Sequence, residues 1–504
     1  MHFSRSTSCV FLFTIVFLFI SVVLSPDFLF AQTSVNIPVE SWVYKSLERL
    51  ELHGFIKSGI LSTKPFSRVE ALRMLEEAEG VWNSLPEQRK KKLESVNVII
   101  KKLEREFKGD LFAEGNFKPI GTPYFKYLYS GGMPDYLNAN NNGDILQKGE
   151  NIRVGLSSSF KLGDFFSFNI SPEFRTTDDN QDLKVVHGYG IFSIRNIDIE
   201  VGREPMWWGD GFHGGLLLTN NAEPFDMIRF TSQIPFLLPS VLSRLGPLKP
   251  TIFLTELEEE RDFPQAKLFG VRLDFKPGPG FRFAVSRTVI FNGEGSEKIT
   301  LSDWYEVLTS EDNSGQTGSG IDNNNIMALD FSVTSGGYGN SVPFAGVKLY
   351  GEIGTEDTSY EEWSKDMAFL AGLLIERPFY LNNSSLRIEW ATTAKGTKHN
   401  SWYTHGIYSD GYRYNGYIMG HHMGTDADDL FSRLEFSSSH GMVIGLEADI
   451  ERKNIHSGET DRTSWTGIDL TYSLLDSFNL MIGYGLEQGD ESSSNVWTGV
   501  EWDF

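Results

Sequence analysis

Two segments of the chain gather aromatic and polar side chains more densely than building a β-structure requires. They run from Gly202 to Arg229 and from Trp402 to Asp428. The C–H faces of sugar rings pack against Trp and Tyr rings, and sugar hydroxyl groups form hydrogen bonds with Asp, Asn and Arg side chains. The two segments therefore predict a carbohydrate-binding site, with the candidate residues Trp207, Trp208, Asp210, Asn220, Asn221, Arg229, Trp402, Tyr403, Tyr412, Tyr414 and Asp426.

Other uses of the same segments stay open. Trp and Tyr also form belts at both surfaces of a membrane, and glycine-rich stretches form tight loops that fold into a barrel lumen. His421 and His422, together with Asp426, Asp428 and Asp429, offer ligand types for a metal ion, but their spacing fixes no coordination geometry. We therefore predict no metal site and no cofactor.

The sequence lacks the common motifs of enzyme active sites. It contains no G-x-S-x-G nucleophile elbow, no H-E-x-x-H zinc helix and no phosphate-binding loop. A hydrolase site built from scattered residues would escape such a search. We predict that the protein is not an enzyme and has no catalytic residues.

The last strand of the chain indicates the scaffold that positions the two segments. Residues 496–504 alternate between two sets of side chains, and a period of two places each set on one face of a strand. The set Val496, Thr498, Val500, Trp502 and Phe504 suits hydrocarbon, and the set Trp497, Gly499, Glu501 and Asp503 suits water. The pattern is typical of the closing strand of an outer-membrane barrel. The edge strand of a soluble all-β domain is the alternative.

Similar alternation recurs along residues 110–504, for example over 269–275, 328–333 and 478–486. A transmembrane barrel strand needs about 9–11 residues with apolar and polar side chains in turn. Allowing roughly 22 residues for each strand and its connection, the segment holds about 18 strands. The predicted fold class is mainly β, a large antiparallel transmembrane β-barrel preceded by a small N-terminal helical bundle.

Charges at inward-facing positions favour this barrel over a soluble sandwich. Arg272, Asp274 and Asp449 are examples. A charge in a packed interior is costly unless it is paired, whereas a wide barrel lumen holds water, so we predict that these side chains face water. Connections are either short, as at 277–280, or long, as at 394–429, which is the asymmetry expected of periplasmic turns and extracellular loops.

Residues 35–108 follow a helical period and predict a periplasmic bundle of three helices. The first carries Val43, Leu47 and Leu50 on one face and stops at Gly54. The second begins at a capping box, residues 67–70, and the third at Pro86.

Residues 1–31 have the pattern of a secretory signal, with an apolar core from Val10 to Leu24 and cleavage near Ala31. That core is too short for a comfortable transmembrane helix, which needs about 20 apolar residues. Cys9 lies inside it and is the only cysteine. The mature chain therefore contains no disulfide.

The formal net charge is −22. A face that binds nucleic acid needs clustered Lys and Arg residues. We predict no nucleic-acid partner.

The segments 203–229 and 402–428, taken with the helical start and the barrel end, resemble the capsule-assembly Wzi family of outer-membrane proteins. The resemblance implies a barrel of about 18 strands, a helical bundle at its periplasmic end, and a lectin-like role in anchoring or organising capsular polysaccharide. The expected partners are capsular or exopolysaccharide, outer-membrane lipid, and periplasmic or export-machinery proteins at the helical bundle. The alternative function is a porin-like diffusion channel.

Overall fold

The computed structural model describes residues 32–91, 93–107, 117–118, 120–296, 323–336, 345–356, 367–395, 401–438, 441–475, 478–489 and 492–502. The predicted signal segment, 1–31, lies outside these ranges, and its cleavage stays a prediction. Within them, no helix combines the length and the apolar character that crossing a membrane requires.

The N-terminal region is helical, as predicted. Its helices are α2 (Trp42–Leu52), α3 (Arg68–Ser84), α4 (Glu87–Lys90) and α5 (Glu94–Phe107). Gly54 follows α2 with a positive φ of 74°, a conformation that glycine adopts without steric cost. The Ser67 hydroxyl accepts a hydrogen bond from the Glu70 amide at 3.2 Å and so caps α3.

The third predicted helix is divided in two. Pro86 caps the four-residue α4, and the long apolar stripe belongs to α5. Leu93 packs against the core of the helical region from the connection between them. This core contains Val43, Leu47 and Leu50 from α2, Met74 and Leu75 from α3, and Val96, Ile100 and Leu103 from α5.

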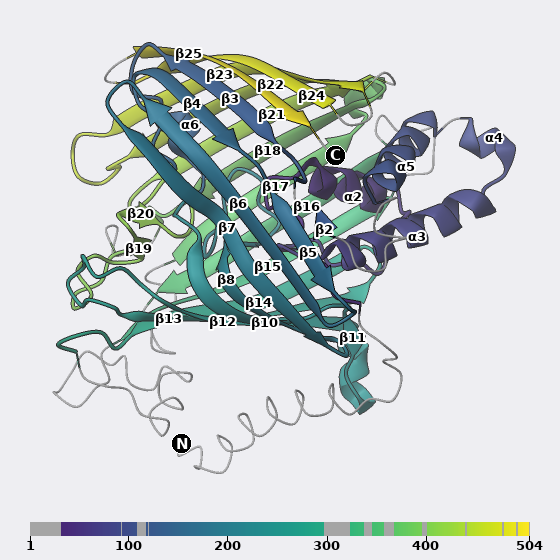
Figure 1. The fold of residues 1–504 in the computed structure, drawn as a ribbon, viewed down its shortest axis with the longest axis horizontal. Coiled ribbons are helices and arrows are strands. Elements are labelled where there is room, and N and C mark those ends of the chain that lie inside the picture. Colours follow the sequence, from purple (N-terminus) through teal and green to yellow (C-terminus); the bar gives the residue numbers. More distant parts are fainter. Residues whose placement is uncertain are drawn as a thin grey trace.

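The rest of the chain forms a closed antiparallel barrel (Figure 1). Its strands are β2 (Phe117–Lys118), β3 (Tyr124–Ser130), β4 (Gly149–Gly155), β5 (Ser158–Leu162), β6 (Phe166–Thr177), β7 (Gln181–Ile194), β8 (Ile197–Glu204), β10 (Phe225–Ser232), β11 (Phe236–Leu237), β12 (Pro247–Glu256), β13 (Lys267–Gly278), β14 (Phe281–Phe291), β15 (Asn323–Gly336), β16 (Gly346–Glu356), β17 (Met367–Glu376), β18 (Ser384–Thr392), β21 (Asp428–Ser437), β22 (Met442–Lys453), β23 (Asp461–Leu475), β24 (Phe478–Gln488) and β25 (Ser492–Trp502).

Three of these elements continue a neighbouring strand rather than add one. β4 and β5 form one strand, because both pair with β6. β10 and β11 form one strand, because both pair with β12. β2 and β3 form one strand, which pairs with β5 and β4. The barrel therefore has 18 strands within the described residues, and β25 closes it by pairing with β3. The predicted strand count and fold class are confirmed.

The two faces of each strand differ as the alternation predicts. On β15, Leu329 and Val333 are exposed on the outer face, while Asp330 is buried on the inner one. On β25, Val496 and Trp502 are exposed. The outer surface is apolar, as contact with hydrocarbon requires.

The prediction that inward charges face water is wrong for Arg272, Asp274 and Asp449, which are buried. Arg272 lies 2.9 Å from Asp274 and 2.7 Å from Asp330. Arg272 and Asp274 are tolerated because they are paired, whereas Asp449 lies 3.7 Å from Nε2 of His213.

The long connections 131–148 and 205–224 lie at one end of the barrel, and short turns such as 195–196 and 279–280 lie at the other. However, 178–180 is a short turn at the first end, and 233–246 is a long connection at the second. The helical region sits at the end of the short turns, where Leu52 packs against Gly346 and Arg49 pairs with Glu376 on β17 at 2.9 Å. The hairpin of β19 (Arg413–Tyr414) and β20 (Tyr417–Ile418) lies at the other end (Figure 1).

Candidate functional site

The two segments rich in aromatic residues fold into the barrel and bond to its wall. Glu389 on β18 accepts hydrogen bonds from the backbone N–H groups of Phe212 at 2.6 Å and His213 at 2.8 Å. Glu352 on β16 accepts one from the Leu216 amide at 2.8 Å. Wall carboxylates thus satisfy loop amides that would otherwise be buried without partners.

The second segment is held in the same way. Glu356 on β16 accepts from the Tyr403 amide at 2.5 Å. The Tyr403 hydroxyl donates to the Leu216 carbonyl at 2.6 Å, which joins the two segments to each other. Both segments therefore form one plug inside the barrel, defined here as residues 205–224 and 401–427.

The N-terminal region fills the opposite end of the lumen. Glu48 on α2 lies 2.8 Å from Nζ of Lys348 and 2.5 Å from a guanidinium nitrogen of Arg387. Burial opposes the charge on Glu48, but Arg387 and Lys348 outweigh it and lower its pKa to about 2. Strand β1 (Thr63–Lys64) pairs with β9 (Trp207–Trp208), so the N-terminal region and the plug meet in a two-stranded sheet.

The predicted aromatic residues are all buried. Five of the six are 4% exposed or less, and Tyr414 is 9% exposed. They pack with each other and with aliphatic residues of the plug, for example Tyr403 on Tyr412 at a centroid distance of 5.8 Å. Packing in one hydrophobic core is thus a contact that the structure gives to Trp208, Trp402, Tyr403, Tyr412 and Tyr414. Trp207 instead donates from Nε1 to the Gly211 carbonyl at 3.0 Å and lies under the ammonium of Lys64.

The predicted polar residues are engaged inside the protein. Asp210 pairs with Lys348 at 2.8 Å and with Arg282. The Asn221 side chain donates to the Ile418 carbonyl at 2.9 Å, and the Asn220 carbonyl accepts from the Asn142 amide. Asp426 lies 2.6 Å from Nδ1 of His456.

Arg229 is separate from the other predicted site residues. It lies on β10 between Glu200, at 2.5 Å, and Glu204, at 3.3 Å, and donates to the Pro65 carbonyl. It therefore belongs to the contact between the wall and the N-terminal region rather than to the plug.

The β19–β20 hairpin carries polar and aromatic groups to the surface of the plug. Asn415 and Gly416 form its turn with positive φ angles of 48° and 83°, as a two-residue hairpin turn requires. Tyr414 and Tyr417 pair across the turn. The exposed Asn415 donates to Glu223 at 2.9 Å. The sequence did not predict Tyr417, Asn415 and Glu223 as site residues, although the Asn-Gly pair indicates a hairpin turn.

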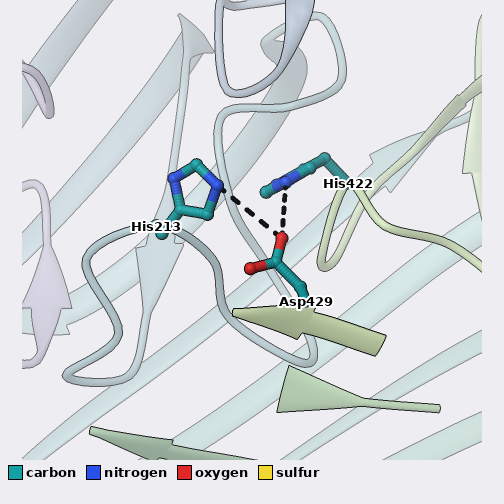
Figure 2. Close-up of side chains that lie close together, drawn as sticks. All are labelled: His213, His422 and Asp429. Atoms are coloured by element: carbon teal, nitrogen blue, oxygen red, sulfur yellow. Dashed lines mark ion pairs between the residues drawn. The ribbon is translucent and has the colours of Figure 1, made fainter. Parts of the chain in front are cut away.

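A second cluster lies between the plug and the wall strands β21 and β22. Nε2 of His422 lies 3.1 Å from Oδ2 of Asp429, and Nε2 of His213 lies 3.6 Å from the same oxygen (Figure 2). Nε2 of His213 is also 3.7 Å from Asp449, and Nε2 of His422 is 3.6 Å from Glu451. Burial, and then the neighbouring His422, lower the pKa of His213 well below its usual range, so its imidazole is neutral.

A family model described as capsule assembly protein Wzi matches residues 130–493 of the chain. The chain belongs to the capsule assembly Wzi family. The match covers the plug and most of the barrel, and it confirms the predicted family. Membership in this family, with the apolar outer surface of the closed barrel, makes the chain a capsule-related outer-membrane protein.

An individual relative has low sequence identity to this chain over a limited part of its length. An uncharacterised 55.8 kDa protein in the cps region of Klebsiella pneumoniae is 28% identical over 193 residues, which is 37% of this chain. The chain spans only 35% of the length of that relative.

Among solved structures, the fold is similar to that of Wzi from Escherichia coli, described as an outer-membrane, carbohydrate-binding β-barrel involved in group 1 capsule assembly. The TM-score is 0.72 and the identity 18%, over 94% of this chain and 100% of that one. OccD3 from Pseudomonas aeruginosa matches with a TM-score of 0.48 and 10% identity over 78% and 94% of the two chains.

Proposed function

We propose that this protein binds capsular or exopolysaccharide at the cell surface and organises it there without changing it chemically. Its family membership supports a role in capsule assembly. The observation that carries the proposal is the filled lumen, because the plug and the N-terminal region occupy the space that a diffusion channel would need.

The porin-like alternative lacks such support. In an open channel, polar wall residues face water. Here Lys348 pairs with both Glu48 and Asp210, and Glu389 with two plug amides. Polar groups that face the lumen serve to anchor its contents, which favours a surface-binding role.

The proposed glycan contact lies at the β19–β20 hairpin. Tyr417 is partly exposed, and the neighbouring Asn415 and Glu223 offer a donor and an acceptor. Lys184 lies 2.6 Å from Glu223 and adds a cation that can meet an acidic sugar. An aromatic ring beside hydrogen-bonding groups is the combination that sugar rings require.

The aromatic residues predicted from the sequence enter this proposal in a supporting role. Trp402 and Tyr403 belong to the same buried core as Tyr414, which lies in the hairpin and pairs with Tyr417. We further propose that lipid surrounds the apolar wall, and that the helical region faces the periplasm and contacts export-machinery proteins.

Replacing Tyr417 with Ala tests the hairpin. We expect binding of the purified protein to surface polysaccharide from its own cells to weaken by about 2- to 10-fold, because one aromatic contact contributes about 0.5–1.5 kcal/mol. Affinity would be measured on immobilised polysaccharide.

The matched control is Tyr380→Ala. Tyr380 is 59% exposed and lies in η2 (Pro378–Tyr380), at the opposite end of the barrel. Equal binding by both variants would refute the assignment of the hairpin, and absence of binding by the native protein would refute the proposed function.

A further inference from the structure

The cluster of His213, His422, Asp429, Asp449 and Glu451 has features that internal packing does not explain. Nε2 of His213, Oδ2 of Asp429 and Oδ1 of Asp449 have no hydrogen-bond partner in the part of the chain that the structure describes. The three side chains are 9%, 2% and 6% exposed. Buried polar atoms in native proteins are nearly all paired, so three unpaired atoms in one cluster indicate a bound group.

The charges in the cluster are also unbalanced. Glu451 pairs with Lys453 at 2.6 Å. Within the described residues, the ion pairs of Asp429 and Asp449 involve only the two histidines and no Lys or Arg. Two neighbouring buried carboxylates repel each other unless a cation or a proton lies between them.

We propose that this cluster binds a divalent transition-metal ion, and that Zn²⁺ suits its donors best. Zn²⁺ binds imidazole nitrogen and carboxylate oxygen at about 2.0–2.2 Å, which sets the corners of its tetrahedron about 3.3–3.6 Å apart. The nitrogen–oxygen distances in the cluster already run from 3.1 to 3.7 Å. Ligand atoms of His213, His422 and Asp429 all lie within 4.8 Å of one another, so these three would form the centre of the site.

The surroundings hold the two imidazoles in place. The His213 ring stacks on Phe431 at a centroid distance of 4.2 Å and on Tyr136 at 5.5 Å. Nδ1 of His422 lies 3.4 Å from the side-chain amide of Asn140, whose Oδ1 is buried without a partner. Nδ2 of the same amide donates to the backbone carbonyl of His213 at 2.6 Å, so Asn140 contacts both histidines.

The ion would hold the plug against the barrel wall. His213 belongs to one plug segment and His422 to the other, whereas Asp429 and Asp449 lie on β21 and β22. Metal binding would therefore join both segments to the wall. This inference does not depend on the proposed glycan contact.

The experiment uses full-length protein in detergent, stripped with a chelator and then equilibrated with Zn²⁺. We expect one bound Zn²⁺ per chain by elemental analysis, and a rise in the temperature at which the folded form is lost in heat-modifiable electrophoresis. His422→Gln and Asp449→Asn should each lower Zn²⁺ affinity by at least about tenfold. Asp449→Asn keeps the side-chain shape, so it serves if His422→Gln does not fold.

The matched control is His405→Gln. His405 accepts from the Ile407 and Tyr408 amides and lies outside the cluster, so this variant should bind Zn²⁺ like the native protein. Folded native protein that binds no Zn²⁺ would overturn the proposal, as would variants that bind it unchanged. Stabilisation by acid alone, with no effect of Zn²⁺, would show that protons hold the carboxylates together instead.

Discussion

Replacing Glu48 with Gln tests whether charge pairing inside the barrel holds the helical region in place. Glu48 contacts both Lys348 and Arg387, and its pKa falls from a usual 4.5 to about 2. One pKa unit corresponds to about 1.4 kcal/mol, so the pairing stabilises the docked helix by on the order of 3 kcal/mol. Gln keeps the shape but loses the charge.

The expected loss is smaller than this full value. Lys348 keeps Asp210 as a partner, and Arg387 keeps the Tyr350 hydroxyl at 3.0 Å. We expect a loss of about 2 kcal/mol, which is a roughly 30-fold increase in local opening. Hydrogen exchange of the α2 backbone amides, followed by mass spectrometry in detergent at neutral pH, measures this directly.

Glu87→Gln is the control for this substitution. Glu87 lies on α4, is 81% exposed, and pairs only with Lys90 at 3.1 Å among the described ion pairs. An exposed pair contributes little, so exchange in α2 should not change. Equal α2 exchange in native protein and both variants would refute the electrostatic account of docking.

The same pairing predicts a pH dependence. Because the pKa of Glu48 is lowered on folding, its stabilisation is complete above about 4.5 and is lost as the pH falls through about 2. After correction for intrinsic rates, α2 should stay protected at a pH near 4. Release of α2 at that pH would contradict the assignment.

Two further predictions concern the plug. Glu389→Gln replaces the carboxylate that accepts from the Phe212 and His213 amides, and we expect a loss of about 1–3 kcal/mol, measured as faster exchange of those amides; unchanged exchange would argue against wall anchoring. Native protein in a planar bilayer should show no steady current, whereas deletion of residues 206–221 should produce one; steady current from the native protein would restore the channel hypothesis.

The barrel was predictable because its signal is local and repeated. The alternation over 269–275 and 328–333 places side chains on two faces wherever the strand lies, and β13 and β15 follow it. The helices were predictable for the same reason, from caps such as Ser67. The break after α4 was missed because Pro86 offers a helix start and the apolar stripe from Leu93 onward was assigned to the same helix, although residues 87–92 contain no apolar side chain.

The interior was not predictable from local patterns. Aromatic residues that suit sugar binding also suit packing, and only the fold of the plug places Trp402 against other rings. The contacts of His213 with His422 and Asp429 join positions about two hundred residues apart, so no local spacing could reveal them. Inward charges were correctly placed on the wall, but their partners lie on other segments.

The different demands on the two faces of the wall have a consequence for how relatives diverge. An outward position such as Leu329 has to stay apolar, and many residues meet that condition. An inward charge such as Arg387 has a specific partner, Glu48, more than three hundred residues away, and losing one member leaves the other buried alone. Across the family, the outer face should drift freely while inner charges change in matched pairs, so covariation between the first helix and the wall would record their docking.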